Sequence, residues 1–296
     1  MKRKIIKQAN QAYTITLPIQ WIRENKLDEK SELDLEIKEK TLMISTKNIT
    51  SGEKTKIDIT GFSAKNIYRC LNALYARGVD EVELTAEDEI AKFTLDSLMG
   101  YAIIEQKSSK IIIKDISGIN YSNIDEIFKR VFQMILALYD SAILDIFKEN
   151  KETLQGLKNR DLEINKFCLY LQRAINKMLY SNHVNGRILF TYSFELEKLG
   201  DEIKRLWRTN IEHKLKKTNE LKELTELSKE ILEKSFDFYF LFNKKGIDEL
   251  YHLRQKIREK AILFKTNSAE AKFIRHLSKI SEDAADLTHL ALMIKL

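Results

Sequence analysis

Two pairs of carboxylates, each spaced four residues apart, are the side chains of this sequence best placed for chemistry. Glu197 precedes Asp201, and Glu282 precedes Asp286. Positions four apart lie one turn above each other on a helix, so each pair would present its oxygens together. Such oxygens suit a hard or borderline cation. His289, three residues after Asp286, would add an imidazole on the same helix face. The spacing is also common by chance, so a solvated acidic face is the alternative interpretation.

Two neighbouring features of the first pair favour a ligand role over the solvated face. Gly200 stands in the middle of the expected helix, where it costs about 1 kcal/mol against alanine unless something approaches the backbone closely. The first acidic pair also borders an apolar stripe at helical spacing, so it would lie beside a buried seam. The residues of that stripe are Leu196, Leu199, Ile203 and Leu206.

The elements that carry both pairs are helices. After Asn120 no strand pattern occurs, and polar or glycine-containing breaks divide the chain into six helical stretches. Taken as two sets of three, over 120–217 and 218–296, the third helix of each set carries one acidic pair. The sequence therefore predicts two three-helix bundles in tandem.

The N-terminal segment concentrates the positive charge of the chain. Residues 1–26 hold six basic residues against the single acid Glu24, while the whole chain carries only +6. Period-two apolar residues around Pro18 and over 33–44 predict strands, with a helical turn at 19–25. A unit of 1–50 is marginal for a core of its own, which suggests an obligate dimer. Its basic residues favour phosphate binding over a merely solvated lysine face, and the candidates for DNA contact are Arg3, Lys4, Lys7 and Arg23.

Between these parts, residues 56–118 alternate between strand and helix patterns. We expect strands at 56–60, 81–85, 101–106 and 110–116, and helices at 63–78 and 90–100. Gly78 and Gly100 fall where helix C-caps are expected. The segment predicts a small α/β module.

Composition excludes several classes of protein. The 296 residues are 44% apolar and 32% charged, and no apolar run reaches the length of a membrane span, so we expect a cytoplasmic protein without a transmembrane segment. No phosphate-binding glycine loop and no HEXXH motif occurs. We expect no enzymatic activity. A hydrolase that uses the paired carboxylates to hold a catalytic metal is a further alternative.

The helical stretches resemble a known family. The runs Glu197-Lys-Leu-Gly-Asp201 and Glu282-Asp-Ala-Ala-Asp286 in the third helix of each set are similar to the E-R-I-G-D type motifs of PhoU, a phosphate-signalling family. The resemblance implies that Glu197, Asp201, Glu282 and Asp286 are metal ligands, for divalent or iron-type ions. The corresponding stretches of the second helices are Asp161-Leu-Glu-Ile-Asn165 and Asp248-Glu-Leu-Tyr-His252.

The N-terminus resembles a second family. Arg3-Lys4-Ile-Ile-Lys7, Tyr13-Thr-Ile-Thr-Leu-Pro18 and Trp21-Ile are similar to the AbrB/MazE/SpoVT swapped-hairpin DNA-binding domain. That resemblance implies a head in which two chains interleave hairpins into one small barrel, with basic residues of the first strand and short helix facing DNA. The combination resembles the archaeal PhoU-type regulators.

These inferences together predict a multidomain α+β chain: a swapped-hairpin β-barrel head, a small α/β module and an all-α pair of PhoU-type three-helix bundles. The expected function is a homodimeric DNA-binding regulator of phosphate uptake with a metal-binding sensor part. The alternative is an adaptor that controls a phosphate transporter ATPase or a sensor kinase through protein contacts, without binding DNA.

Overall fold

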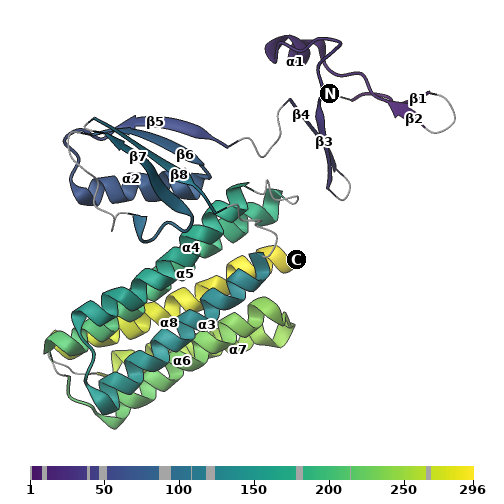
Figure 1. Cartoon of the computed structure of the whole chain (residues 1–296). Helices are drawn as coiled ribbons and strands as arrows, with labels where there is room; N and C mark the ends of the chain where they lie inside the picture. The colour runs from purple at the N-terminus through teal and green to yellow at the C-terminus, as the bar shows by residue number, and fades with distance from the viewer. Residues whose placement is uncertain are drawn as a thin grey trace. The chain divides into compact units, whose positions relative to one another are not determined.

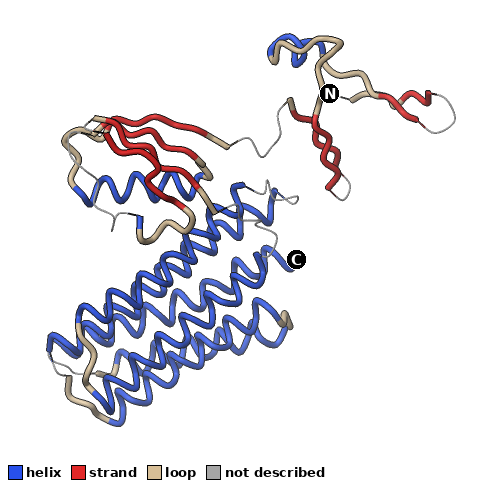
Figure 2. The backbone as a smooth tube through the Cα atoms, in the orientation of Figure 1, coloured by secondary structure: helices blue, strands red, loops and turns tan. Residues whose placement is uncertain are grey.

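The computed structural model describes residues 2–8, 12–38, 41–46, 52–86, 95–107, 109–117, 124–177, 183–213, 215–264 and 268–296. Internal contacts divide the chain into two compact units, Met1–Gly52 and Glu53–Leu296. Figure 1 labels the elements of both units, and Figure 2 distinguishes their helices from their strands by colour.

The first unit consists of two antiparallel hairpins and a short helix. β1 (Ile6–Gln8) pairs with β2 (Ala12–Thr14), and β3 (Asp34–Lys38) pairs with β4 (Thr41–Ser45), with α1 (Ile19–Glu24) between the hairpins. β2 ends at Thr14, so the strand expected to run on toward Pro18 is shorter than predicted. The hairpins form separate sheets, and no closed barrel occurs within the described residues of this chain.

The second hairpin has the register that its apolar alternation predicts. Leu35 lies opposite Ile44, and Ile37 lies opposite Leu42. Because side chains alternate across a strand, these four residues share one face. The residues of the predicted turn at 39–40 lie outside the described residues.

No described side chain of the first unit is buried. A two-stranded hairpin is at best marginally stable alone in water, and apolar surface left in water forgoes about 25 cal/mol per Å². The described residues of the unit therefore do not supply the covering that its apolar side chains require. The large apolar residues exposed in it are Ile5, Ile6, Tyr13, Ile15, Ile19, Leu35, Ile37 and Leu42.

The second unit begins with a four-stranded sheet and one helix. The sheet has the order β5-β6-β8-β7, with the first pair parallel and the other pairs antiparallel. Parallel neighbours need a crossover connection, which α2 supplies between β5 and β6. The elements are β5 (Lys54–Asp58), α2 (Ala64–Arg77), β6 (Glu81–Thr85), β7 (Tyr101–Lys107) and β8 (Lys110–Asp115).

The ends of α2 form as the sequence indicates. The Ser63 side chain accepts from the backbone N–H of Asn66, and Gly78 ends the helix with φ +101°, a conformation that glycine adopts cheaply. The helix expected over 90–100 is not observed in its described part. Residues 87–94 lie outside the described residues, and 95–100 form turns that end at Gly100.

The remaining described residues form the six predicted helices. α3 continues into a π-helical segment, η2 (Asp145–Glu149), where this helical stretch ends. Among the described helices, none combines the length and apolarity that crossing a bilayer requires. The helices are α3 (Ile124–Leu144), α4 (Leu154–Lys177), α5 (His183–His213), α6 (Asn219–Phe240), α7 (Lys244–Ile262) and α8 (Ser268–Lys295).

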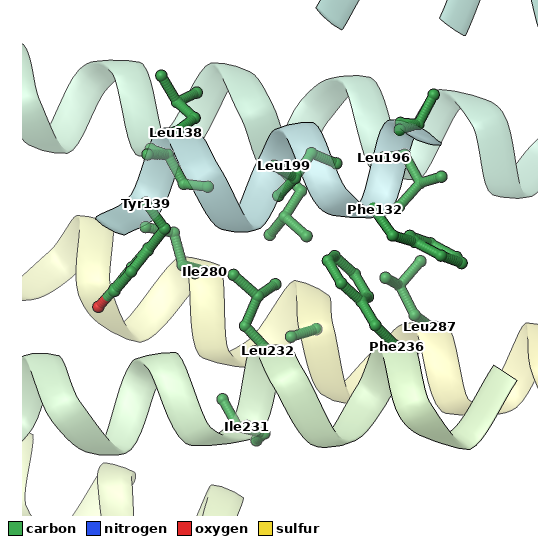
Figure 3. Packing of buried hydrophobic residues seen from close by; sticks show 14 of the residues in the cluster. Phe132, Leu138, Tyr139, Leu196, Leu199, Ile231, Leu232, Phe236, Ile280 and Leu287 are labelled. Carbon is green, nitrogen blue, oxygen red and sulfur yellow. The ribbon is translucent and has the colours of Figure 1, made fainter. Parts of the chain in front are cut away.

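The helices pack as two sets of three around one continuous core. α3, α4 and α5 contact one another, as do α6, α7 and α8, and the sets are joined through α5 against α8 and α3 against α6. Figure 3 shows labelled side chains of α3, α5, α6 and α8 meeting in this core, where the rings of Phe132 and Phe236 stack with centroids 4.4 Å apart. α2 lies against α4, and Leu169 of α4 joins the separate core under the sheet.

The buried seam of α5 confirms the predicted stripe. Leu196, Leu199, Ile203 and Leu206 are fully buried. A Cβ on Gly200 would lie 3.3 Å from Cγ2 of Ile164 on α4. The close approach that the glycine indicates is therefore the packing of α4.

Candidate functional site

The four basic residues predicted to contact DNA are exposed in the first unit. Arg3 and Lys4 precede β1, Lys7 lies within it, and Arg23 lies on α1. None of the four forms an ion pair with a described residue. No carboxylate in the described part of the chain therefore competes with an external anion for these charges.

The first acidic pair faces a carboxylate of α4 across a lysine. Lys204 Nζ lies 2.6 Å from Oδ1 of Asp201 and also donates to Oδ2 of Asp161. Asn165, one turn from Asp161 on α4, donates to the same carboxylate at 3.5 Å. The structure thus brings the predicted second-helix stretch and the third-helix pair together, with an ammonium group between Asp161 and Asp201.

This cluster, defined as Asp161, Glu197, Asp201 and Lys204, carries more negative than positive charge. Burial raises the pKa of Glu197, and the neighbouring Asp201 and Asp161 raise it further. Burial also raises the pKa of Asp161, against the opposing effect of Lys204. For Lys204, hydrogen bonds to the two aspartates outweigh burial and raise the pKa. Three carboxylates around one ammonium therefore favour uptake of a proton.

Two buried oxygens at this cluster lack hydrogen-bond partners within the described residues. Oδ1 of Asp161 and Oδ1 of Asn165 are buried without a partner. Unpaired buried oxygens cost free energy, about 1–3 kcal/mol each by comparison with other proteins. The packing of α4 against α5 therefore buries unpaired polar atoms, which lowers the stability of the folded chain.

The second acidic pair is held by two arginines of α7. Arg254 Nε lies 2.6 Å from Glu282 Oε2, and an Nη atom of Arg258 lies 2.7 Å from the same oxygen. Burial alone would raise the pKa of Glu282, but the hydrogen bonds from Arg258 and Arg254 outweigh it and lower the pKa. Asp286 is 69% exposed, and its Oδ1 lies 3.5 Å from Nη2 of Arg254, farther than Oε2 of Glu282 does. Glu282 is thus an ion-pair partner in this structure.

The other residues connected with the second pair do not converge on it. Asp248, His252 and His289 are exposed. Glu249, inside the predicted second-helix stretch, is paired with Lys234 of α6 at 3.0 Å. The stretch 248–252 therefore supplies no ligand opposite Glu282, and the arginines one and two turns later take that place.

The side chains as they lie do not fit a metal ion. Each acidic pair already contacts the cationic end of a lysine or arginine, and the part of the chain described contains no group of three His, Cys, Asp or Glu side chains able to hold a metal. A cation would have to displace Lys204 or the α7 arginines. The ligand roles of Glu197, Asp201, Glu282 and Asp286 stay predictions.

Sequence reasoning missed the basic partners, although spacing signals them in part. Lys204 and Arg205 follow Asp201 by three and four residues, the spacing of helical ion pairs. Arg254 and Arg258 also stand four apart on one face of α7. No local signal could show that α7 turns this face toward Glu282.

A buried hydrogen-bonded pair between the two helix sets was also missed. His276 Nδ1 on α8 lies 2.7 Å from Glu202 Oε1 on α5, and both side chains are buried. Burial would raise the pKa of Glu202, but hydrogen bonds from His276 and Arg205 lower it. This pair fixes α5 against α8 at Glu202, the residue that follows Asp201.

Comparisons with known proteins gave a structural likeness to a solved structure. No family model matches the sequence, and no curated protein matches it. The fold is similar to the crystal structure of the phosphate transport system regulatory protein PhoU from Streptococcus pneumoniae, with 14% identity and a TM-score of 0.49 over 59% of this chain and 94% of that one. At this identity the likeness concerns the chain trace alone. The predicted AbrB/MazE/SpoVT-like head finds no support in these comparisons and stays a prediction.

Proposed function

We propose that the chain is a homodimeric DNA-binding regulator of phosphate uptake, whose first unit binds DNA and whose helices respond to a signal. The observation that carries the proposal is the surface of the first unit. There Arg3, Lys4, Lys7 and Arg23 are exposed without ion pairs to described residues, on a unit that buries no described side chain. Free cations and uncovered apolar surface suit a dimer bound to a polyanion.

The positions of the cations support DNA binding by the first unit. Several basic side chains of the second unit have carboxylate partners, as Arg254, Arg258 and Lys204 do. A paired cation gains less binding free energy from a phosphate than an unpaired cation does, because it must first give up its carboxylate partner. The four head residues have no such partner among the described residues, and each phosphate contact releases a bound counterion from DNA.

The exposed apolar side chains of the first unit support a dimer. Leu35 and Ile37 are 64% and 78% exposed on the shared face of the second hairpin. A second copy that interleaves its hairpins would cover this face and close the edges of both sheets. Symmetry would then present two copies of the basic residues to the two strands of a duplex.

The connection with phosphate rests on the motif resemblance of Glu197 to Asp201 and Glu282 to Asp286. It assigns the helical part a regulatory role in the cytoplasm, with a phosphate transporter ATPase or a sensor kinase as possible partners. No catalytic step is assigned to any residue. The helical part would transmit its state to the head, which is the part that contacts DNA.

The test is the salt dependence of DNA binding. A fluorescently labelled mixed-sequence duplex is titrated with the full chain from low to moderate salt. Each phosphate contact contributes about 0.9 to the slope of log affinity against log salt, so alanine at each of Arg3, Lys4, Lys7 and Arg23 should lower the slope by roughly that amount per chain. The loss doubles in a symmetric dimer.

Lys216 and Lys217 are the matched controls, because both are exposed lysines of the second unit. Alanine at these positions should leave the slope unchanged. A wild-type slope near zero, or slopes indifferent to the four head substitutions, would exclude DNA binding and leave the adaptor as the better hypothesis.

A further inference from the structure

A small cavity lined mostly by cations lies between α5 and α8. Its volume is about 250 Å³. It stands at the junction of the two helix sets, on the helices that also carry the acidic pairs. The charged residues that line it are four basic ones, Arg205, Arg208, Lys272 and Arg275, and one acidic one, Glu212.

Helical spacing gathers these side chains. Arg205 and Arg208 stand three apart on α5, and Lys272 and Arg275 stand three apart on α8, so each pair shares one face of its helix. α5 packs against α8 along the seam between the helix sets. Both basic faces consequently border the same cavity.

Several donors of this cavity have no partner among the described residues. Arg208 uses Nε for Glu212, at 2.6 Å, which leaves both of its Nη groups without a described partner. Arg275 is exposed and forms no ion pair with a described residue. Lys272 reaches Glu212 only at 3.9 Å. Guanidinium groups with free N–H edges are the side chains that bind phosphate oxygens in pairs.

The inner wall of the cavity is held in place. His276 lines it, and its Nδ1 lies 2.7 Å from Glu202. Glu202 in turn accepts from an Nη atom of Arg205 at 2.6 Å. The Nε2 atom of His276 is buried without a partner in the described chain. A buried hydrogen-bonded chain of this kind orients Arg205 before any ligand arrives, which reduces the entropy lost on binding.

The charges do not balance without a ligand. Four cations line the cavity beside Glu212, and an excess of one positive charge remains even when Asp201 and Glu202, the partners of Arg205, are counted. Like charges gathered around one cavity repel one another, at a cost in folding free energy. A bound oxyanion would offset that cost.

We propose that this cavity binds a phosphate group, either of inorganic phosphate or of a mononucleotide. The volume admits one tetrahedral oxyanion with its hydrogen-bonding side chains around it. Arg208 and Arg275, from opposite sides of the cavity, supply the free donors, and Lys272 supplies a third charge. The proposal is independent of DNA binding, because it involves no residue of the first unit.

The test is binding of inorganic phosphate to the full chain, measured by calorimetric titration and by the thermal unfolding midpoint. Sodium chloride of equal ionic strength at the same pH is the reference. We expect phosphate to raise the midpoint above that in chloride, because a ligand of the folded state stabilises it. Lys272→Gln with Arg275→Gln should weaken binding at least about tenfold, since each removed hydrogen bond to a charged group is worth more than that factor.

The matched control is Lys129→Gln with Arg130→Gln, which makes the same charge change at exposed residues of α3 outside the cavity lining. It should bind phosphate as the wild type does. Lys272 and Arg275 are both exposed, so their replacement should not prevent folding, which far-ultraviolet circular dichroism checks.

A parallel titration with adenosine monophosphate distinguishes the two sources of the phosphate group. Binding of phosphate alone assigns the cavity to the free ion, whereas binding of the nucleotide alone assigns it to the phosphate of an organic ligand. The proposal is overturned if neither stabilises the chain beyond chloride. It is equally overturned if the Lys272 and Arg275 double variant binds as tightly as the wild type.

Discussion

Arg173 of α4 donates from its guanidinium to the carboxylate of Asp115 at the end of β8, with 2.7 Å between Nη2 and Oδ2. The arginine is fully buried. It also donates to Asp80 and, at 2.6 Å, to the backbone oxygen of Val79. Its guanidinium lies 4.9 Å from the ring centroid of Tyr75. One side chain thus ties the sheet, α2 and the helical part into one unit.

Replacing this arginine should therefore be costly. We expect Arg173→Leu to lower the free energy of unfolding by about 3–5 kcal/mol, the range for removing one partner of a buried charge cluster, because Asp115 would lose its ion pair with Arg173 and Asp80 would keep only that with Lys177. Urea unfolding followed by circular dichroism measures the change. Arg187→Leu on α5, an exposed arginine without a described ion pair, should change stability by less than about 0.5 kcal/mol. Equal effects of the two substitutions would show that the buried cluster contributes nothing particular.

The raised pKa of Glu197 predicts a dependence of stability on pH. The folded chain holds this proton more tightly than the unfolded chain, so the free energy of unfolding should fall as pH rises from the ordinary value of 4.5 through the raised pKa in the folded state. Above the raised pKa, the contribution of this proton to the free energy of unfolding is lost completely. Glu197→Gln should remove this fall and be more stable than the wild type at neutral pH by a few tenths of a kcal/mol, since it removes repulsion from Asp201.

The measurement is urea unfolding of wild type and variant at several pH values from acidic to neutral. Glu195→Gln is the control on the same helix, where the carboxylate is paired with Lys198 at 2.7 Å. A Glu197→Gln variant whose pH profile parallels that of the wild type would argue against the assigned proton uptake.

The position of Lys204 makes a prediction about metal. Because its ammonium lies between Asp161 and Asp201, we expect Lys204→Met to leave carboxylates that bind a divalent cation more tightly than the wild type does. Calorimetric titration with Mn²⁺, together with elemental analysis of the purified proteins, measures this. Stoichiometric metal in the wild type that Glu197→Gln and Asp201→Asn remove would instead support the ligand roles inferred from the motif resemblance.

The exposed face of the second hairpin makes a prediction about assembly. Leu35→Lys with Ile37→Lys should convert a dimer into a monomer, because charges would then face the surface that a second copy must cover. Light scattering coupled to size-exclusion chromatography measures the mass. Ile104→Lys, at an exposed apolar residue of β7 in the second unit, is the control and should leave the dimer intact. A double variant with the mass of the wild type would count against assembly through the head.

Local patterns in the sequence determined the elements that depend on neighbouring residues alone. The register of Leu35 with Ile44 follows from apolar alternation around a turn, and the end of α2 follows from the conformational freedom of Gly78. The buried stripe of α5 follows from helical spacing. The predicted helix over 90–100 shows where local pattern was insufficient, because its described end forms turns at Gly100.

Only the tertiary structure decided what the charged side chains contact. Asp161 and Lys204 are 43 residues apart and meet because α4 packs on α5. Glu282 meets Arg254 because α7 turns one particular face toward α8. Local periodicity places an acidic residue on a helix face but carries no information about which distant residue packs opposite it. That choice is made by the shapes of the packed helices, and it determines whether a carboxylate meets a cation of the chain itself or is left to bind another.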